Sequence, residues 1–180
     1  MIVGVISDTH VPDRAARLMP RALEVFQQAG VEAIVHAGDI SSPPVLAALE
    51  QIAPVYAVRG NRDGRLLPHL PPQRVVTLGG VRIGLTHGHG SLWDYIAEKP
   101  YILFHGLQPE RYIQRVLSWF PEAEVVVFGH IHLQVNQRVD GRLVFNPGSA
   151  CERVYGLSIP GVGLLHINPG EPARGEIILL

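Results

Sequence analysis

The chain has 180 residues, of which 47% are hydrophobic and 17% charged, so it can form one domain over residues 1–180 and is not a disordered chain. Its 15 Lys and Arg and its 16 Asp and Glu give a net charge of −1, which excludes a strongly basic surface for nucleic acid or anionic membranes. The single cysteine, Cys151, excludes an internal disulfide and a cysteine zinc cluster, and without an apolar run of about 20 residues or a signal peptide we expect a cytoplasmic protein.

The first half of the chain alternates short apolar runs with amphipathic segments, which is typical of parallel β-α-β units. Gly30 is placed to end the first helix. The second helix opens on two prolines, after Ser41 or Ser42 as its cap. We therefore expect strands at 2–6, 33–36 and 55–58, and helices at 12–29 and 43–52.

Antiparallel hairpins dominate the second half, where Gly79-Gly80 and Asp140-Gly141 are typical two-residue turns. The stretch 88–108 has no clean period, and a lid, an oligomer contact and a core-packed insertion remain open for it. The pattern predicts an α/β fold of two sheets packed face to face with helices outside. The expected elements are a helix at 110–120 and strands at 74–78, 81–85, 125–128, 135–139, 143–145, 163–167 and 176–180.

Five predicted strands end in a polar cluster. Because ligand sites of open α/β sheets lie outside the carboxyl ends of the strands, we expect these clusters to face one crevice. Gly60 and Gly129 each precede a candidate ligand, where the chain must turn sharply or approach another group closely. The clusters are Asp8-Thr9-His10, Gly38-Asp39, Gly60-Asn61-Arg62-Asp63, His87-Gly88-His89 and Gly129-His130-Ile131-His132.

The residue types in these clusters indicate a metal site. Asp8 and His10 are two residues apart, as are His130 and His132, so each pair would aim at one point from extended backbone. Two carboxylates, one amide oxygen and up to five imidazoles favour Mn²⁺, Fe, Zn²⁺ or Ni²⁺ over Ca²⁺ or Mg²⁺ alone. So many ligands exceed the need of one four-coordinate zinc and fit two metals that share a carboxylate. Taken singly, Gly-Asp and Gly-Asn are also ordinary turn sequences, so the joint pattern carries the prediction.

The ordered set of motifs resembles the calcineurin-like metallophosphoesterase superfamily. The short chain, with Asn146-Pro147-Gly148-Ser149 after the last histidines, is similar to the small bacterial and archaeal phosphodiesterase branch of that family. The resemblance spans most of the chain and implies a four-layer α/β/β/α sandwich of two mixed sheets flanked by helices. The motifs that carry it are Asp8-x-His10, Gly38-Asp39, Gly60-Asn61-x-Asp63, His87-Gly88-His89 and Gly129-His130-x-His132.

The resemblance also implies two divalent metal ions bridged by Asp39. Manganese is the metal it favours, with iron, zinc and nickel as alternatives. The implied reaction is hydrolysis of a phosphodiester by a hydroxide that the two metals activate. The implied ligands are Asp8, His10, Asp39 and His132 for one ion, and Asp39, Asn61, His87 and His130 for the other.

The sequence departs from the family pattern at Arg62, where many relatives have a histidine. A guanidinium is a poor proton donor near neutral pH but binds phosphate bidentately. We expect Arg62, held by Asp63, to stabilise substrate charge, which favours leaving groups of low pKa. A solvated loop residue is the alternative for Arg62, and His89 is expected to touch substrate or to support a ligand by a hydrogen bond. The candidate catalytic residues are Asp39, Asn61, Arg62, Asp63 and His89.

Three classes of function compete. The leading one is a phosphodiesterase acting on a small phosphoester, with a phosphomonoesterase of broad range as the alternative in the same chemistry. A eukaryotic retromer subunit uses this fold as a scaffold, so an interaction protein is the second class. A nuclease ranks last because the chain has no basic patch, and a protein phosphatase is disfavoured because Asp-Arg-Gly is missing after Gly38. The stretch from Trp93 to Phe104 is the candidate surface for a homo-oligomer, and no membrane partner is expected.

Overall fold

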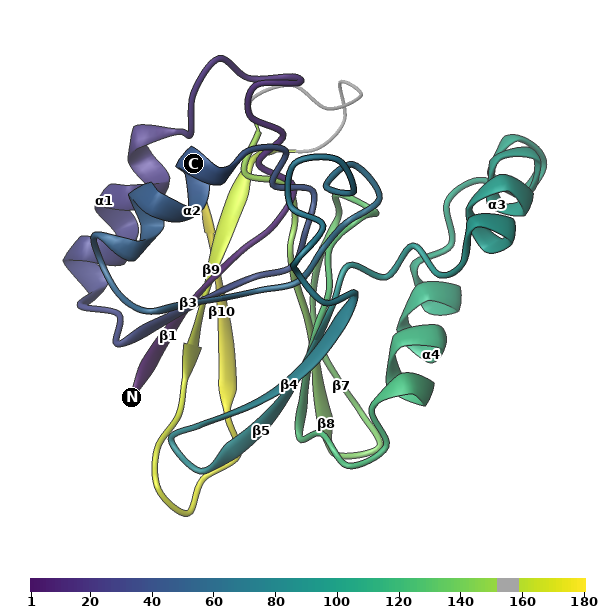
Figure 1. Cartoon of the computed structure of the whole chain (residues 1–180). Helices are drawn as coiled ribbons and strands as arrows, with labels where there is room; N and C mark the ends of the chain where they lie inside the picture. The colour runs from purple at the N-terminus through teal and green to yellow at the C-terminus, as the bar shows by residue number, and fades with distance from the viewer. Residues whose placement is uncertain (152–158) are drawn as a thin grey trace.

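Two five-stranded mixed sheets lie at the centre of the protein, and the computed structural model describes residues 1–151 and 159–180 (Figure 1). In chain order the elements are β1 (Ile2–Ile6), α1 (Pro20–Ala29), β2 (Ala33–His36), α2 (Pro43–Glu50), β3 (Val55–Ala57), β4 (Gln73–Leu78), β5 (Val81–Thr86), α3 (Leu92–His105), α4 (Pro109–Trp119), β6 (Val125–Val127), β7 (Gln134–Val139), β8 (Arg142–Pro147), β9 (Gly161–His166) and β10 (Arg174–Leu179). The strand order is β10-β9-β1-β2-β3 in one sheet and β4-β5-β6-β8-β7 in the other.

Parallel pairing brings the carboxyl ends of several strands together. β1 pairs in parallel with β2, and β2 with β3, because each crossover helix returns the chain to the same end of the sheet. In the other sheet β5 pairs in parallel with β6, and β6 with β8. The hairpins β4–β5, β7–β8 and β9–β10 supply the antiparallel edges. The loops after β1, β2 and β3 therefore start at one edge of the first sheet.

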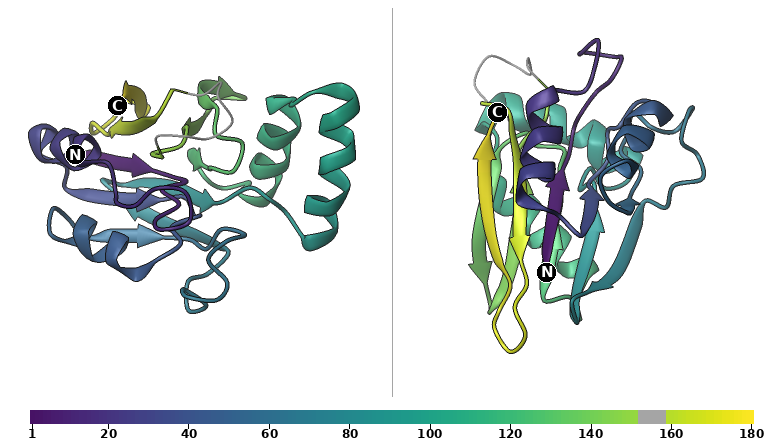
Figure 2. Two further views of the ribbon diagram at one scale, coloured as in Figure 1. Left: turned by 90° about the horizontal axis from the view of Figure 1, so that it is seen from above. Right: turned by 90° about the vertical axis from the view of Figure 1, so that its left-hand side faces the viewer.

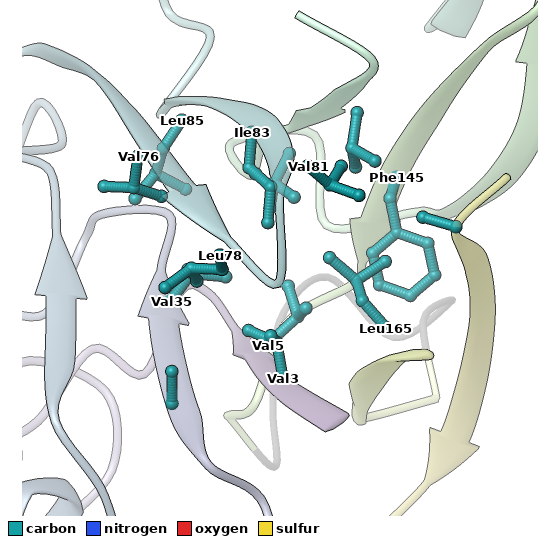
Figure 3. Close-up of a cluster of buried hydrophobic side chains, with 14 of the residues drawn as sticks. Val3, Val5, Val35, Val76, Leu78, Val81, Ile83, Leu85, Phe145 and Leu165 are labelled. Atoms are coloured by element: carbon teal, nitrogen blue, oxygen red, sulfur yellow. The ribbon is translucent and has the colours of Figure 1, made fainter. Parts of the chain in front are cut away.

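The two sheets pack face to face across a layer of buried aliphatic side chains (Figure 3). Alternate residues of each strand face this layer, as the two-residue period of a strand requires. This layer contains Val3 and Val5 of β1, Ile83 and Leu85 of β5, and Phe145 of β8. Burial of this apolar surface, at roughly 25 cal/mol per Å², is the main force that holds the two sheets together.

Helices cover the outer faces of both sheets, which gives four layers, α/β/β/α (Figures 1 and 2). Phe26 of α1 and Leu49 of α2 are buried against the first sheet. Ile113 and Val116 of α4 are buried against the second sheet. The predicted sandwich of two mixed sheets flanked by helices is therefore confirmed.

The predicted hairpins and the end of the first helix are confirmed in detail. Gly79 and Gly80 connect β4 to β5, and both have positive φ, which glycine adopts without strain. Asp140 and Gly141, which also have positive φ, connect β7 to β8. Gly30 ends α1 with φ of 60°, and its N–H donates to carbonyls of the last turn.

The first helix is shorter than predicted. α1 begins at Pro20 instead of position 12. The residues after His10 form a turn in which the Arg14 N–H donates to His10 O at 2.8 Å. Pro20 has no N–H to donate, so it is accommodated in the first turn of a helix and not in its middle.

The helix α3 was not predicted, and it occupies most of the stretch 88–108. Ser91 and Asp94 form a reciprocal capping box at its start. Figures 1 and 2 show α3 beside α4 at the outer edge of the molecule. Trp93, Leu103 and Phe104 are 78%, 79% and 78% exposed, so a core-packed insertion is excluded for this stretch.

Candidate metal centre

The loops that follow β1, β2, β5 and β6 are joined by hydrogen bonds at one edge of the two sheets. The backbone N–H of Asp8 donates to Gly38 O at 3.0 Å, and the N–H of Gly129 donates to His87 O at 3.2 Å. The N–H of His130 donates to Asp8 Oδ2 at 3.0 Å, which connects a loop of one sheet to a loop of the other. Polar clusters that are far apart in the sequence therefore meet in one place.

Five of the seven predicted ligands have a left-handed backbone, which is uncommon for residues other than glycine. The argument that Asp8 and His10 converge assumed an extended backbone, and that assumption is wrong, because φ is 54° and 50° at the two residues. Their side chains converge through a tight turn, in which the His10 N–H donates to Asp39 O at 3.1 Å. Such strained conformations persist at functional sites, where the surroundings fix them. The five residues are Asp8, His10, Asp39, His130 and His132.

Gly60 and Gly129 make close approaches that a side chain would block. A β-carbon at Gly60 would overlap the Asp39 carboxylate, and one at Gly129 would overlap Ser7 Oγ. The prediction of a close approach at these two glycines is therefore confirmed. Because they lack side chains, the loops after β3 and β6 can pack directly on the carboxylates of the cluster.

One group of ligand atoms comes from Asp8, His10 and His132, whose atoms lie within 4.8 Å of one another. Asp8 Oδ1 lies 3.0 Å from His132 Nε2 and 3.7 Å from His10 Nε2. The two Nε2 atoms are 3.2 Å apart. A carboxylate oxygen and two ring nitrogens that converge in this way form a donor set for a divalent transition-metal ion.

A second group comes from Asp8, Asp39 and His87, again within 4.8 Å of one another. His87 Nε2 lies 3.5 Å from Asp39 Oδ1 and 3.1 Å from Asn61 Oδ1. His87 Nδ1 lies 2.8 Å from the carbonyl oxygen of Ala37. This carbonyl can only accept, so Nδ1 donates and Nε2 carries the lone pair when the ring is neutral.

Asp8 and Asp39 both lie between the two groups. Asp8 belongs to each of them. Asp39 Oδ1 lies 3.5 Å from His87 Nε2, and Asp39 Oδ2 lies 3.9 Å from His10 Nδ1, so the two oxygens of one carboxylate face different groups. Both carboxylates are buried, and buried negative charges need compensating positive charge nearby.

The cluster also contains buried ring nitrogens without a partner. His10 Nδ1 and His89 Nδ1 make no hydrogen bond within the described part of the chain. Buried polar atoms are nearly always hydrogen-bonded, so such atoms mark positions for a group that the chain itself does not supply. Together with the two converging donor sets, they fit a pair of divalent metal ions.

Burial and mutual charge shift the protonation of the cluster. Burial alone would raise the pKa of Asp8, but the charges of His132 and His87 hold it well below its usual range. Burial would lower the pKa of His87, but the charges of Asp39 and Asp8 raise it to about 9. Burial lowers the pKa of His10 to about 4. At neutral pH the metal-free cluster thus holds a proton on His87 that a bound metal must displace.

His130, a predicted ligand, lies in neither of the two groups found among the described residues. The centroid of its ring is 5.1 Å from that of His87, and its Nε2 lies 3.1 Å from Glu98 Oε2 of α3. Sequence reasoning missed Glu98 because it did not recognise α3. The signal was available in Ser91-x-x-Asp94, a capping box that predicts a helix containing Glu98.

Arg62 and Asp63 lie on the loop after β3, and their partners differ from the expected ones. Three backbone N–H groups at 2.7 to 2.8 Å already occupy the buried Asp63 carboxylate. The expectation that Asp63 holds the Arg62 guanidinium is therefore corrected. That guanidinium lies 3.7 Å from Asp13 and 3.9 Å from Asp39. The donors to Asp63 are Ile40, Ser41 and Gly60.

His36 and His89 lie next to the cluster as neutral rings. His36 Nδ1 accepts the Gly38 N–H at 3.2 Å, and its Nε2 lies 3.3 Å from Thr9 Oγ1. Burial lowers the pKa of His36 to about 3 and that of His89 to about 4. The His89 ring centroid lies 5.4 Å from that of His87, so His89 borders the donor set without belonging to it.

Comparison with known proteins decides the family. The model of the calcineurin-like phosphoesterase superfamily domain matches residues 1–170. The chain belongs to this superfamily. It is 36% identical to a probable metallophosphoesterase of Methanothermobacter thermautotrophicus over 179 aligned residues, and the alignment covers 99% of this chain and 92% of the relative. It is 30% identical to a phosphodiesterase of Methanocaldococcus jannaschii over 192 aligned residues, and this alignment covers 99% of each chain.

This calcineurin-like phosphoesterase also shares its fold with solved structures. The crystal structure of Vps29 from Chaetomium thermophilum matches it with a TM-score of 0.74 over 100% of this chain and 95% of that one. Their sequences are 18% identical, so the likeness concerns the fold alone. Among the described residues of the phosphoesterase, no helix combines the length and apolar character needed to cross a bilayer.

Proposed function

We propose that this calcineurin-like phosphoesterase is a metal-dependent phosphodiesterase that acts on small phosphoesters. The observation that carries the proposal is the convergence of two donor groups on a shared buried carboxylate, Asp8. The name of the Methanocaldococcus jannaschii relative supports it. Two divalent ions outweigh the charges of Asp8 and Asp39, so the site would attract a phosphate anion although the chain has a net charge of −1.

Seven residues would hold the two ions, with Asp39 as the bridge. Its two oxygens face His87 and His10 at 3.5 and 3.9 Å, which supports that role. When bound, two divalent ions supply Lewis acidity toward phosphoryl oxygens and lower the pKa of water. We expect Mn²⁺ first, and iron, zinc and nickel suit the same donors. The sets are Asp8, His10, Asp39 and His132, and Asp39, Asn61, His87 and His130.

Backbone hydrogen bonds hold these ligands before any substrate arrives. Asp39 Oδ1 accepts the Arg62 N–H at 2.9 Å, and the Asp63 carboxylate ties the loop after β3 to the loop after β2. Asn61 lies between these contacts, so its amide oxygen is presented to His87 by a fixed loop. Such preorganisation removes reorganisation of the site from the reaction step.

We assign Arg62 to binding the phosphate. Its side chain is 38% exposed, and its guanidinium lies 3.9 Å from Asp39 Oδ2, so it can reach substrate at the edge of the donor set. A guanidinium binds two phosphate oxygens at once and keeps its proton near neutral pH. Arg62 therefore stabilises negative charge and does not protonate the leaving group, which favours substrates with a leaving group of low pKa.

We assign His89 to a polar contact with the same substrate. Its Nδ1 is buried and makes no hydrogen bond within the described residues. The ring lies beside His87 and His130, with centroids at 5.4 and 6.1 Å. A neutral imidazole at this position can donate or accept one hydrogen bond to a substrate oxygen.

A paired hydrolysis assay tests the proposed function. The chelator-treated protein is assayed with bis-p-nitrophenyl phosphate and p-nitrophenyl phosphate, each with and without Mn²⁺. We expect turnover that requires Mn²⁺ and is faster on the diester. Faster turnover of the monoester would overturn the diesterase assignment in favour of a phosphomonoesterase. An absence of turnover on both esters, with metal bound, would overturn the enzyme assignment.

One observation favours a scaffold as the second candidate. Apolar side chains of α3 lie exposed at the outer edge of the molecule, Trp93, Ile96, Leu103 and Phe104 among them. Exposed apolar groups of this size commonly mark contacts with other proteins. The chain shares its fold with Vps29, and a related protein of Schizosaccharomyces pombe is named vacuolar protein sorting-associated protein 29. This likeness is compatible with a role as a scaffold. A protein that binds metal without phosphoesterase activity would support this candidate.

A further inference from the structure

Glu98 of α3 reaches the edge of the metal-ligand cluster. Its Oε2 lies 3.1 Å from His130 Nε2, and the exposed fractions of the two side chains are 10% and 12%. α3 lies at the outer edge of the molecule, so this contact joins a peripheral helix to the loop after β6 (Figure 1). None of the five motifs contains Glu98.

Two residues of α4 lie beside the Glu98 carboxylate. Arg115 Nη1 lies 3.5 Å from Glu98 Oε1 and also donates to Gly88 O at 3.3 Å. Tyr112 is buried, and burial together with the nearby Glu98 carboxylate raises the pKa of its hydroxyl. Because the Arg115 guanidinium contacts both Glu98 and Gly88 O, the carboxylate is held relative to α4 and to the loop after β5.

The chemistry of the Glu98 contact decides which nitrogen of His130 carries a proton. An ionised carboxylate accepts hydrogen bonds and donates none. Nε2 of His130 must therefore be the donor, and the lone pair of the neutral ring is then on Nδ1. Histidines that bind metals almost always donate their other ring N–H to a carboxylate, a carbonyl or water. His87 shows the same arrangement with the carbonyl oxygen of Ala37.

We infer that Glu98 is a positioning residue of the metal site, which orients His130 and fixes its tautomer so that Nδ1 binds metal. The inference rests on the proposed function, since it takes His130 as a ligand. The backbone N–H of His130 contacts Asp8 Oδ2, so the loop that carries this ring already packs on the ligand cluster. The role of Glu98 makes α3 and α4 part of the support of the site.

The proposal predicts a selective loss of metal affinity. Mn²⁺ is titrated into the metal-free protein, with free Mn²⁺ followed by electron paramagnetic resonance. Glu98→Ala is expected to weaken one of the two sites about 10- to 100-fold, to leave the other unchanged and to keep a stoichiometry of two. Glu98→Gln keeps the shape and one acceptor oxygen, so its loss is expected to be smaller. Glu110→Ala, at an exposed glutamate of α4, is the matched control and should bind as the wild type does.

A double-mutant cycle separates positioning from other roles. If Glu98 acts through His130, the variant Glu98→Ala/His130→Ala should bind no more weakly than His130→Ala alone. Additive losses, or a stoichiometry of one in Glu98→Ala, would overturn the proposal in favour of Glu98 as a ligand itself. Unchanged or tighter binding in Glu98→Ala would overturn it as well. If Glu98→Ala does not fold, Glu98→Gln carries the same comparison.

The wild-type titration keeps the two proposals distinguishable. Failure of the wild-type protein to bind a pair of Mn²⁺ ions would count against the proposed function. Two bound ions in the wild type, with no difference in Glu98→Ala, would count against the role of Glu98 alone.

Discussion

Asp8 Oδ1 lies 3.0 Å from His132 Nε2, although 124 positions separate the two residues along the chain. Asp8 follows β1 in one sheet, and His132 follows β6 in the other. The second oxygen of Asp8 accepts hydrogen bonds from Ser7 Oγ at 2.5 Å and from the His130 N–H at 3.0 Å. One carboxylate therefore connects a loop of each sheet and also takes part in the ligand cluster.

The two buried aspartates give a direct test of the metal centre. Asp39→Ala is expected to lose both ions and to reduce turnover by roughly 1,000-fold or more, because the variant removes the proposed bridge. Asp8→Ala is expected to lose the ion that Asp8 would hold with His10 and His132, and to weaken the other, since Asp8 also lies in the second donor group. Metal content after gel filtration, measured by atomic emission, checks both variants.

The control for these variants is Asp140→Asn in the turn between β7 and β8. Asp140 has φ of 50°, a conformation that asparagine tolerates, and it belongs to neither donor group. This variant should keep two ions and full activity. Retention of two ions by Asp39→Ala would show that Asp39 is not the bridge.

The histidines of the cluster predict an unusual pH profile for the stability of the metal-free protein. The folded-state pKa of His10, His36 and His89 is lowered to about 4, 3 and 4, against about 6.5 in an unfolded chain. As pH falls below 6.5 the unfolded state therefore takes up three protons that the folded state does not. The folded-state pKa of His87 is raised to about 9, so above pH 6.5 the folded state keeps one proton that the unfolded state has lost. The free energy of unfolding therefore falls toward acid pH and also toward alkaline pH.

The expected result is a maximum of the melting temperature near pH 7, where the four histidines bind about as many protons in the unfolded as in the folded state. Between pH 6 and 4.5 stability should fall about three times as steeply per pH unit as between pH 7 and 8.5, in the ratio of protons bound. Thermal unfolding of the chelator-treated protein across pH 4.5 to 8.5 checks this. His87→Gln should abolish the decline on the alkaline side. A melting temperature that rises from pH 7 to 8.5 in the wild type would contradict the assignment of a charged His87.

The fold and the motif residues were predictable because their signals are local. Gly79-Gly80 and Asp140-Gly141 fix the turns of the two predicted hairpins, and Gly30 ends α1 where the sequence predicts. The apolar runs of the first half form strands because they are too short for helices and are separated by turn residues. Clusters at the ends of parallel strands meet by topology alone, so Asp8 and His87 could be placed together without knowledge of their side-chain contacts.

The remaining features depend on contacts that the sequence does not encode locally. Glu98 lies on a helix without clean periodicity, and only the fold brings it to His130. The left-handed backbone of Asp8 and His10 results from hydrogen bonds between loops, such as that from the Asp8 N–H to Gly38 O. The partners of Asp63 are N–H groups of two other segments, so sequence proximity to Arg62 was misleading.

Asp63→Ala is expected to destabilise the fold as well as the site. The variant leaves the N–H groups of Ile40, Ser41 and Gly60 without their acceptor. An orphaned buried donor costs on the order of 1–3 kcal/mol, so the free energy of unfolding should fall by about 3 kcal/mol or more. Urea denaturation of the metal-free protein measures this, with Glu50→Ala, at an exposed residue of α2, as the control. A loss below about 1 kcal/mol would show that water replaces the carboxylate.

Arg62→Ala is expected to separate substrate binding from metal binding. The guanidinium lies 3.7 Å from Asp13 and 3.9 Å from Asp39 at 38% exposure, so its removal leaves the donor groups intact. A charge-assisted hydrogen bond contributes about 1.5–3 kcal/mol, so kcat/KM for the diester should fall about 10- to 100-fold while metal content stays at two ions. Steady-state kinetics and metal analysis of the same preparation check both, with the exposed Arg65→Ala of the same loop as the control. Loss of metal would mean that Arg62 supports Asp39, and unchanged kinetics would mean that it is a solvated loop residue.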